Sequence, residues 1–139
     1  MFETFEHTAD LGLRVEAADL PELFSEAARG LLAMLAVEPQ QVRGAEQRAF
    51  TIEADSLDYL LFDWLSELLY AYDDEHWLFS QYEVRVHGEG PYELTAVCRG
   101  EPLDRDRHAL DHEVKAITYH GLLVEPLTNG WRAELIVDI

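Results

Sequence analysis

Residues 20–35 read LPELFSEAARGLLAML, and their apolar side chains recur at the i, i+3, i+4 and i+7 spacing of one helix face. Asp19 can cap this helix, because its carboxylate can accept a backbone N–H of the first turn. Pro21 fits that turn, where a residue has no intrahelical hydrogen bond to lose, and Glu22 stands three residues after the cap. We therefore predict a long amphipathic helix here.

A second stretch, residues 57–72, repeats the same apolar spacing. Asp55 or Ser56 would begin this helix, since both residue types are favoured caps. The acidic run at residues 73–75 closes it. Because acidic side chains oppose the dipole of a helix C-terminus, we expect the chain to fray or turn sharply there.

Elsewhere apolar and polar residues alternate, which is typical of strands. Strands are expected at residues 11–17, 50–54, 82–86, 92–98, 113–127 and 131–139. The turn Gly88–Pro91 joins two of them into a hairpin, and Asn129–Gly130, the strongest short hairpin signal, joins the last two. Two long amphipathic helices with such hairpins predict an α+β fold, with the helices packed on an antiparallel or mixed sheet in one domain spanning residues 1–139.

The composition bounds the function. Of the 139 residues 48% are hydrophobic, enough for a sizeable core, and no apolar run or leader pattern predicts a membrane span or a secretory signal. The 28 acidic and 10 basic residues give a net charge of −18, which a phosphate backbone repels, so a cation or a basic protein is a better-matched partner than nucleic acid. Cys98, the single cysteine, falls on the apolar side of a strand and is expected to be a core thiol. We expect a cytoplasmic protein.

The first candidate site is the segment EHTADLG at residues 6–12, between an initial strand and the next one. Gly12 permits a close approach of another group to the backbone. The simpler interpretation is a turn in which Thr8 or Asp10 hydrogen-bonds to local amides.

The second candidate site is the segment Val137–Ile139, which stops within a strand pattern. If that strand is paired, the Asp138 side chain and the main-chain carboxylate of Ile139 repel each other, and a hard divalent cation relieves such repulsion. A third carboxylate, such as that of Asp10, would complete an all-oxygen site for calcium, magnesium or manganese rather than zinc. The alternative is a frayed, solvated terminus, and the sequence by itself does not bring Asp10 beside Asp138.

The third candidate site is the charged segment 104–113. His108 and His112 have the i, i+4 spacing of two zinc ligands on a helix, but the HExxH pattern is absent and a charged loop is favoured. Glu101 and Asp104 could form an acid–base pair, although nothing in the sequence fixes their geometry.

The fourth candidate is residues 113–120, which mix polar and apolar side chains and include Lys115, the only lysine of the chain. On a strand, Lys115, Ile117 and Tyr119 share one face, and His120 lies on the other. Such a strand is either a partly exposed edge or a surface that contacts a partner.

At these residues the sequence resembles the archease family. Residues 6–12 are similar to the family's EHTADxG signature, residues 113–120 to its EVKAITYH signature, and Val137–Ile139 to its closing Asp-Ile. The likeness spans the whole chain in order, size and acidic character. It implies an archease-like fold and a protein that assists an RtcB-type RNA ligase in tRNA splicing and RNA repair.

What the resemblance implies is a non-catalytic cofactor, with no catalytic residues of its own. Such a protein promotes guanylylation of a ligase histidine and allows repeated turnover, meeting RNA and GTP only through the ligase. Carried over residue by residue, the family's metal site falls on Asp10, Asp138 and the terminal carboxylate of Ile139. Calcium is the first candidate, and magnesium and manganese suit the same oxygen ligands.

Contacts with the ligase are expected at His7, Lys115, Tyr119 and His120. Lys115 would meet an acidic group or a phosphate at that junction, or would instead pair with Glu113 or Glu125 on its own surface. Because a ligase site for RNA ends and GTP should be basic, opposite charge would steer the acidic protein towards it.

Two other function classes stay open. A small metal-dependent hydrolase could use Asp10, Asp138 and a histidine such as His7 or His120. A plain binding or chaperone-like module would use its carboxylates only for solvation. The accessory protein is favoured over the hydrolase because no nucleophile or general base stands at a recognisable spacing.

Overall fold

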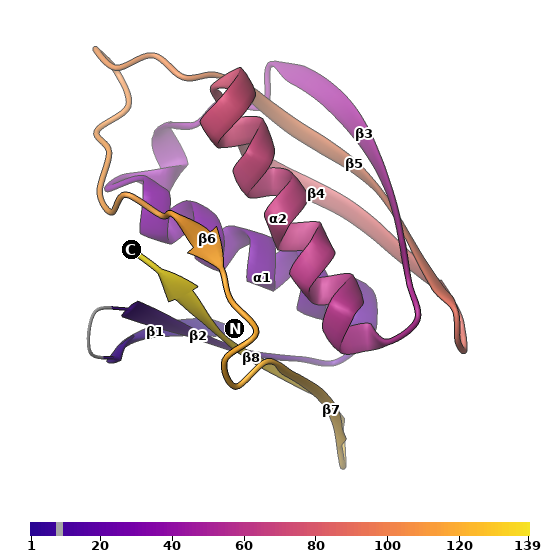
Figure 1. Cartoon of the computed structure of the whole chain (residues 1–139). Helices are drawn as coiled ribbons and strands as arrows, with labels where there is room; N and C mark the ends of the chain where they lie inside the picture. The colour runs from indigo at the N-terminus through magenta and orange to yellow at the C-terminus, as the bar shows by residue number, and fades with distance from the viewer. Residues whose placement is uncertain (8–9) are drawn as a thin grey trace.

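The computed structural model describes residues 1–7 and 10–139, and it contains two helices and two antiparallel sheets (Figure 1). The helices are α1 (Leu20–Leu35) and α2 (Leu57–Glu75), with a short 3-10 turn at Pro39–Gln41. The strands are β1 (Phe2–His7), β2 (Asp10–Ala17), β3 (Glu46–Ala54), β4 (Trp77–Gly88), β5 (Tyr92–Pro102), β6 (Ala116–Ile117), β7 (Leu123–Leu127) and β8 (Gly130–Asp138). Within the described ranges, neither helix has the length and apolar character needed to cross a membrane.

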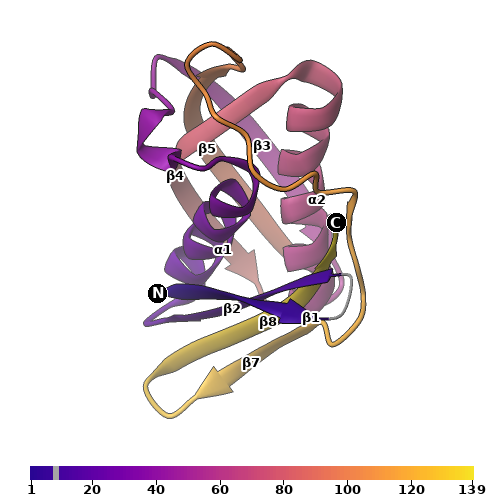
Figure 2. The same ribbon diagram turned by 90° about the vertical axis from the view of Figure 1, so that its left-hand side faces the viewer.

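Both helices lie between the two sheets (Figures 1 and 2). One sheet has the order β1-β2-β8-β6, with β7 also paired to β8, and the other has the order β3-β5-β4. The helix α1 contacts β2 on one side and β4 on the other, and α2 contacts strands of both sheets. The predicted α+β class is therefore confirmed. The strands differ from the expectation in forming two sheets rather than one, because alternation along a strand fixes its faces but not its partners.

The caps place both helices as predicted. The carboxylate of Asp19 accepts the backbone N–H of Glu22 at 2.9 Å, and Ser56, rather than Asp55, caps α2 by accepting the N–H of Tyr59 at 3.2 Å. The acidic run 73–75 forms the last turn of α2, and the helix ends where His76 takes the left-handed conformation. That residue supplies the sharp turn that the opposing charges predicted.

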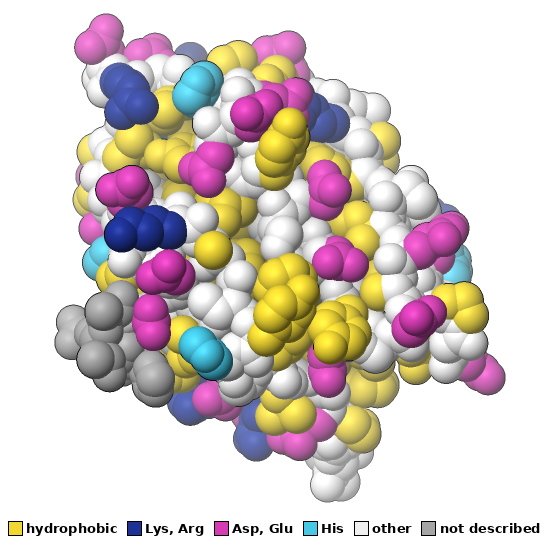
Figure 3. Space-filling model, viewed as in Figure 1, with side chains coloured by type: hydrophobic (Ala, Val, Ile, Leu, Met, Phe, Trp, Pro, Cys, Tyr) yellow, Lys and Arg dark blue, Asp and Glu magenta, His cyan; other side chains and the backbone are white. Residues whose placement is uncertain are grey.

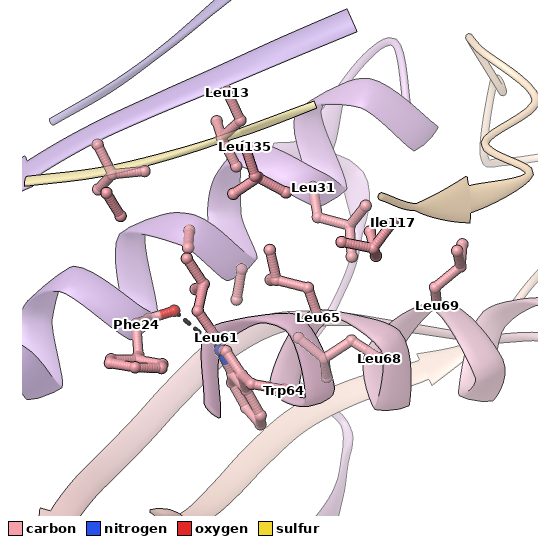
Figure 4. Packing of buried hydrophobic residues seen from close by; sticks show 14 of the residues in the cluster. Leu13, Phe24, Leu31, Leu61, Trp64, Leu65, Leu68, Leu69, Ile117 and Leu135 are labelled. Carbon is pink, nitrogen blue, oxygen red and sulfur yellow. Dashed lines mark hydrogen bonds between the residues drawn. The ribbon is translucent and has the colours of Figure 1, made fainter. Parts of the chain in front are cut away.

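The core is built where α1 and α2 cross (Figure 4). Phe24 and Trp64 are fully buried, and the indole N–H of Trp64 donates to the carbonyl of Phe24 at 3.0 Å, which joins the two helices. Leu13 and Leu135 enter the same core from β2 and β8. This packing holds the face of β2 and β8 that points away from the helices in a fixed position.

Both predicted hairpins form, but the extended stretch at residues 113–127 is interrupted. Only Ala116–Ile117 and Leu123–Leu127 are strands, and a turn lies between them. In this turn Gly121 has a φ of 62°, in the left-handed region that glycine adopts without steric cost. The hydroxyl of Thr118 donates to the carbonyl of Ile136 at 2.9 Å, which ties the start of the turn to β8. The turn places Tyr119 against α2, as the ring contacts described below show.

Candidate cation site at the end of strands β2 and β8

The strand register brings the start of β2 beside the end of β8. In the β2–β8 pair, Asp10 lies directly opposite Asp138, and Asp138 lies opposite Ala116 on its other side. Figure 1 shows the C-terminus beside β6. On the β1 side, the backbone of His7 is paired with Asp10, whereas the His7 side chain lies outside the described residues. Three segments that the sequence singled out separately therefore meet at one edge.

Asp10 and Asp138 lie on the outer face of this sheet. Leu11 and Val137, the next residues along, face each other and are buried in the core. Because side chains alternate along a strand, the two aspartates point away from the helices. Residues directly opposite each other have Cβ atoms about 4.5–5.5 Å apart, so the two carboxylates are close neighbours.

The charge pattern of this face changes at the aspartates. Two other cross-strand pairs combine opposite signs: Arg14 with Glu134 at 3.2 Å, and Arg132 with Glu16 at 2.8 Å. Asp10 and Asp138 instead place two acidic groups opposite each other, an arrangement that destabilises an antiparallel pair. A cation between them changes this repulsion into attraction, and that is the chemistry the arrangement suits.

An aromatic ring occupies the row next to the aspartates. Phe5 lies opposite Gly12, and a Cβ at Gly12 would occupy the space of the Phe5 ring. The Arg14 guanidinium lies over the same ring, 5.0 Å from its centroid. Gly12 of the signature segment therefore has a steric role here, because it lets an apolar ring cover the sheet beside Asp10.

Residues 113–120 reach the site through the backbone of Lys115, whose N–H donates to the carbonyl of Asp138 at 2.8 Å. The Lys115 side chain is exposed, and no ion pair found within residues 1–7 and 10–139 includes it. Glu125, one of its expected partners, lies 3.7 Å from Arg132 instead. Of the two alternatives for Lys115, pairing with Glu113 or Glu125 is not formed among the described residues, and contact with a partner stays a prediction.

The oxygen atoms at this edge show which kind of cation could bind there. No three His, Cys, Asp or Glu side chains gather at one point in the part of the chain that the structure describes. Among the described side chains, Asp10 and Asp138 bring two facing carboxylates to this edge, and Ile139 follows directly, half-buried. An all-oxygen set of this kind fits a hard cation and not zinc.

The predicted alternatives in residues 101–113 are not formed. His108 is 3% exposed and uses both ring nitrogens: Nδ1 accepts the backbone N–H of Asp104 at 2.9 Å, and Nε2 lies 3.0 Å from the Glu101 carboxylate. The segment is also not helical, so His108 and His112 do not share a helix face and form no zinc site. The Glu101–Asp104 acid–base pair is wrong as well, since Asp104 accepts the N–H of Asp106.

Glu101 is instead the centre of a buried hydrogen-bond cluster that sequence reasoning missed. Its carboxylate accepts from the Arg107 guanidinium, from the backbone N–H of Arg43 at 2.6 Å, and from His108. Burial alone raises the pKa of Glu101, but these hydrogen bonds outweigh it and lower the pKa to about 2. The cluster fixes the loop that leads into residues 113–120. No local spacing marks this cluster in the sequence, because Arg43 lies 58 residues before Glu101.

Cys98 behaves as expected. It is fully buried on β5, and burial raises the pKa of its thiol to about 12. A thiol with so high a pKa is not a nucleophile at neutral pH, which confirms the core role.

Comparison with known proteins decides the family. The model of the Archease protein family (MTH1598/TM1083) matches residues 2–139. The chain belongs to the archease family. Protein archease of Pyrococcus abyssi is 39% identical to it, over 99% of this chain and 98% of that protein. The Methanopyrus kandleri archease is also 39% identical, over 99% of each chain.

Solved structures share the fold of this archease. The solution structure of Methanobacterium thermoautotrophicum protein 1598 has a TM-score of 0.87 at 33% identity and covers 99% of this chain and 98% of its own. A crystal structure from Thermotoga maritima, described as an archease and possible chaperone, has a TM-score of 0.66 at 22% identity over 100% and 98% of the two chains. The second likeness concerns the fold alone. Both agree with the predicted archease-like α+β architecture.

Proposed function

We propose that this archease activates an RtcB-type RNA ligase without catalysing ligation itself. It promotes guanylylation of the ligase histidine and allows repeated turnover in cytoplasmic tRNA splicing and RNA repair. The observation that carries the proposal is the register of Asp10 against Asp138, beside Lys115. Residues from the two family signatures and from the chain end meet there, which is expected if they act on one partner.

The proposed site holds one hard divalent cation between Asp10, Asp138 and the main-chain carboxylate of Ile139. The like charges of the two aspartates that face each other support it. Calcium is the first candidate, and magnesium and manganese suit the same oxygen donors. A cation bound there supplies positive charge for a phosphate or carboxylate at the ligase junction. The exposed ammonium group of Lys115 would add a second positive charge beside it.

Electrostatics support a protein partner rather than RNA. The net charge of −18 repels a phosphate backbone, so RNA and GTP are met only through the ligase. A ligase site that handles RNA ends and GTP should be basic. Opposite charges then accelerate the encounter and fix its orientation, and the acceleration weakens as salt concentration rises.

The proposal is tested by ligation with limiting cognate ligase, with and without this archease. Product should exceed one equivalent per ligase only when the archease is present. Ligation that stays at one equivalent in its presence contradicts the proposal. The alternative hydrolase predicts phosphoester turnover by the isolated archease, lost on Asp10→Asn substitution, and that result would replace the accessory function.

Extending the chain beyond Ile139 should impair activation. A Gly-Ser extension converts the terminal carboxylate into an amide and moves its charge away, so we expect activation to fall roughly 10-fold or more. The measurement is multiple-turnover ligation at limiting ligase. The Ile139→Val protein is the matched control, because it changes the side chain and keeps the carboxylate. Normal activation by the extended form would remove Ile139 from the ligand set.

A further inference from the structure

Three aromatic rings form an exposed cluster where the segment after β6 packs against α2. Tyr59 and Phe62 come from the first turns of α2, and Tyr119 comes from the segment after β6; we call these three residues the aromatic platform. Tyr119 stacks on Phe62 with centroids 4.0 Å apart and planes at 10°, and it meets Tyr59 edge-on at 5.7 Å. Figure 3 shows hydrophobic side chains gathered in this region, with acidic side chains around them.

The platform is arranged in advance but not buried. Tyr59 is 53% exposed and Tyr119 is 59% exposed, although each contacts another ring. Aromatic rings grouped on a surface are typical of protein contact sites, because rigid rings bury much area at small entropic cost. Since one face of Tyr119 lies against Phe62, its exposure is concentrated on the opposite face and edge. That face is available to a stacking partner.

The charges around the platform select the partner. Asp58 and Asp63 lie on the same turns of α2, and Asp63 is one helical turn from Tyr59. Neither aspartate belongs to an ion pair found among the described residues; Asp58 accepts the backbone N–H of Val124. Partial burial also raises the pKa of the Asp63 carboxyl. An aromatic face bordered by carboxylates attracts cations, and arginine stacks best on such a ring.

We propose that the aromatic platform binds an arginine-bearing segment of a basic protein, with the guanidinium stacked on Tyr119 and the acidic side chains of this face attracting its charge. Nucleic-acid bases also stack on aromatic rings, but the net charge of −18 repels their phosphates. A second copy of this chain carries the same charge and is repelled too. A basic protein segment satisfies both the rings and the carboxylates.

The aromatic platform lies close to β6, the strand that pairs with the end of β8. Tyr119 is three residues beyond Ala116, which pairs with Asp138, so at most about 11 Å of Cα trace separates the platform from the β6 end of the site. A segment docked on the platform therefore lies close to β6 on the α2 side of the sheet, and the Asp138 side chain lies on the opposite face. The inference rests on the proposed function for its partner, since the docked segment is then part of the ligase.

The test compares Tyr119→Ala with Tyr70→Ala. Tyr70 is a matched control because it is 58% exposed on the same helix and lies outside the platform. Hexa-arginine peptide is titrated into each isotope-labelled protein and followed by NMR. We expect shifts centred on residues 59, 62 and 119, an affinity about tenfold lower for Tyr119→Ala, and near wild-type affinity for Tyr70→Ala and Tyr119→Phe. Three results would overturn the inference. They are equal weakening by both alanine variants, chemical-shift changes spread over the acidic surface, and binding of a single-stranded RNA hexamer that is tighter than binding of the peptide.

Ligase binding separates this inference from the proposed function. Calorimetry with the cognate ligase should show weaker binding by Tyr119→Ala, while Asp138→Asn binds the ligase and fails to activate it. If Tyr119→Ala weakens binding and Asp138→Asn activates normally, the proposed cation function fails and the platform stands. If Tyr119→Ala binds the ligase as wild type does and Asp138→Asn fails to activate, the platform alone is overturned.

Discussion

The Asp138→Asn archease should support roughly 10- to 100-fold less ligase turnover than wild type while remaining folded. Asparagine keeps the shape of the side chain and removes its charge, so the change falls on cation binding. The backbone hydrogen bonds of Asp138, including the one from Lys115, do not involve the side chain and are kept. Asp10→Asn should have the same effect, because Asp10 is the facing carboxylate.

The matched control is Glu134→Gln, which removes a carboxylate from the same face of β8. Glu134 pairs with Arg14 on the partly exposed surface, where an ion pair contributes about 0–1 kcal/mol. We expect this protein to activate the ligase nearly as well as wild type. Thermal unfolding adds a second readout: calcium or manganese should raise the unfolding temperature of wild type and of Glu134→Gln but not of Asp138→Asn. Equal losses of activation in Glu134→Gln and Asp138→Asn would mean that overall acidity, and not this site, is what matters.

The Glu101→Gln substitution should give the largest loss of stability. An amide at position 101 cannot accept from all of Arg107, Arg43 and His108, and its NH₂ group would face one of these donors. Breaking a buried charged pair of this kind should lower the free energy of unfolding by about 3 kcal/mol and the unfolding temperature by roughly 10 °C. Asp106→Asn, an exposed change in the same loop, should stay within about 0.5 kcal/mol of wild type.

The pH dependence of that loss has a definite sign. Because the folded-state pKa of Glu101 is lowered from 4.5 to about 2, its charged form stabilises the fold above pH 4.5, and this contribution is lost as the pH falls towards 2. The difference in stability between wild type and Glu101→Gln should therefore be constant near neutral pH and shrink below pH 4.5. Denaturant titrations at pH 7, 4.5 and 3 measure it. A difference that grows in acid would contradict the assigned hydrogen bonds.

The local elements of this fold could be predicted from the sequence because their signals are local. The caps at Asp19 and Ser56, the apolar stripes of the helices, and the turn at Asn129–Gly130 each depend on residues a few positions apart. The division into two sheets could not be predicted, since strand pairing depends on contacts far apart in the chain. The break at residues 118–122 depends on Thr118 bonding to β8, which is also a long-range contact.

In the candidate site, too, the sequence predicted individual residues but not the contacts that the fold makes between them. Asp10, Asp138 and Lys115 were singled out by their motifs, but only the β1-β2-β8-β6 order brings them to one edge. Tyr119 was expected at a partner contact, whereas its stacking on Phe62 depends on how α2 packs over β6. The Glu101 cluster joins residues 43, 101 and 107 and has no periodicity that would mark it.

The most direct measurement is paramagnetic broadening of backbone amide signals by substoichiometric Mn²⁺ in the wild-type archease. Manganese accepts the same oxygen ligands as the proposed cation and broadens only nearby signals. We expect the signals of residues next to Asp10, Ala116 and Asp138 to broaden first, and Asp138→Asn to abolish this pattern. Broadening that begins instead in the acidic groove lined by Asp73 and Glu113, or that spreads evenly over the surface, would contradict it.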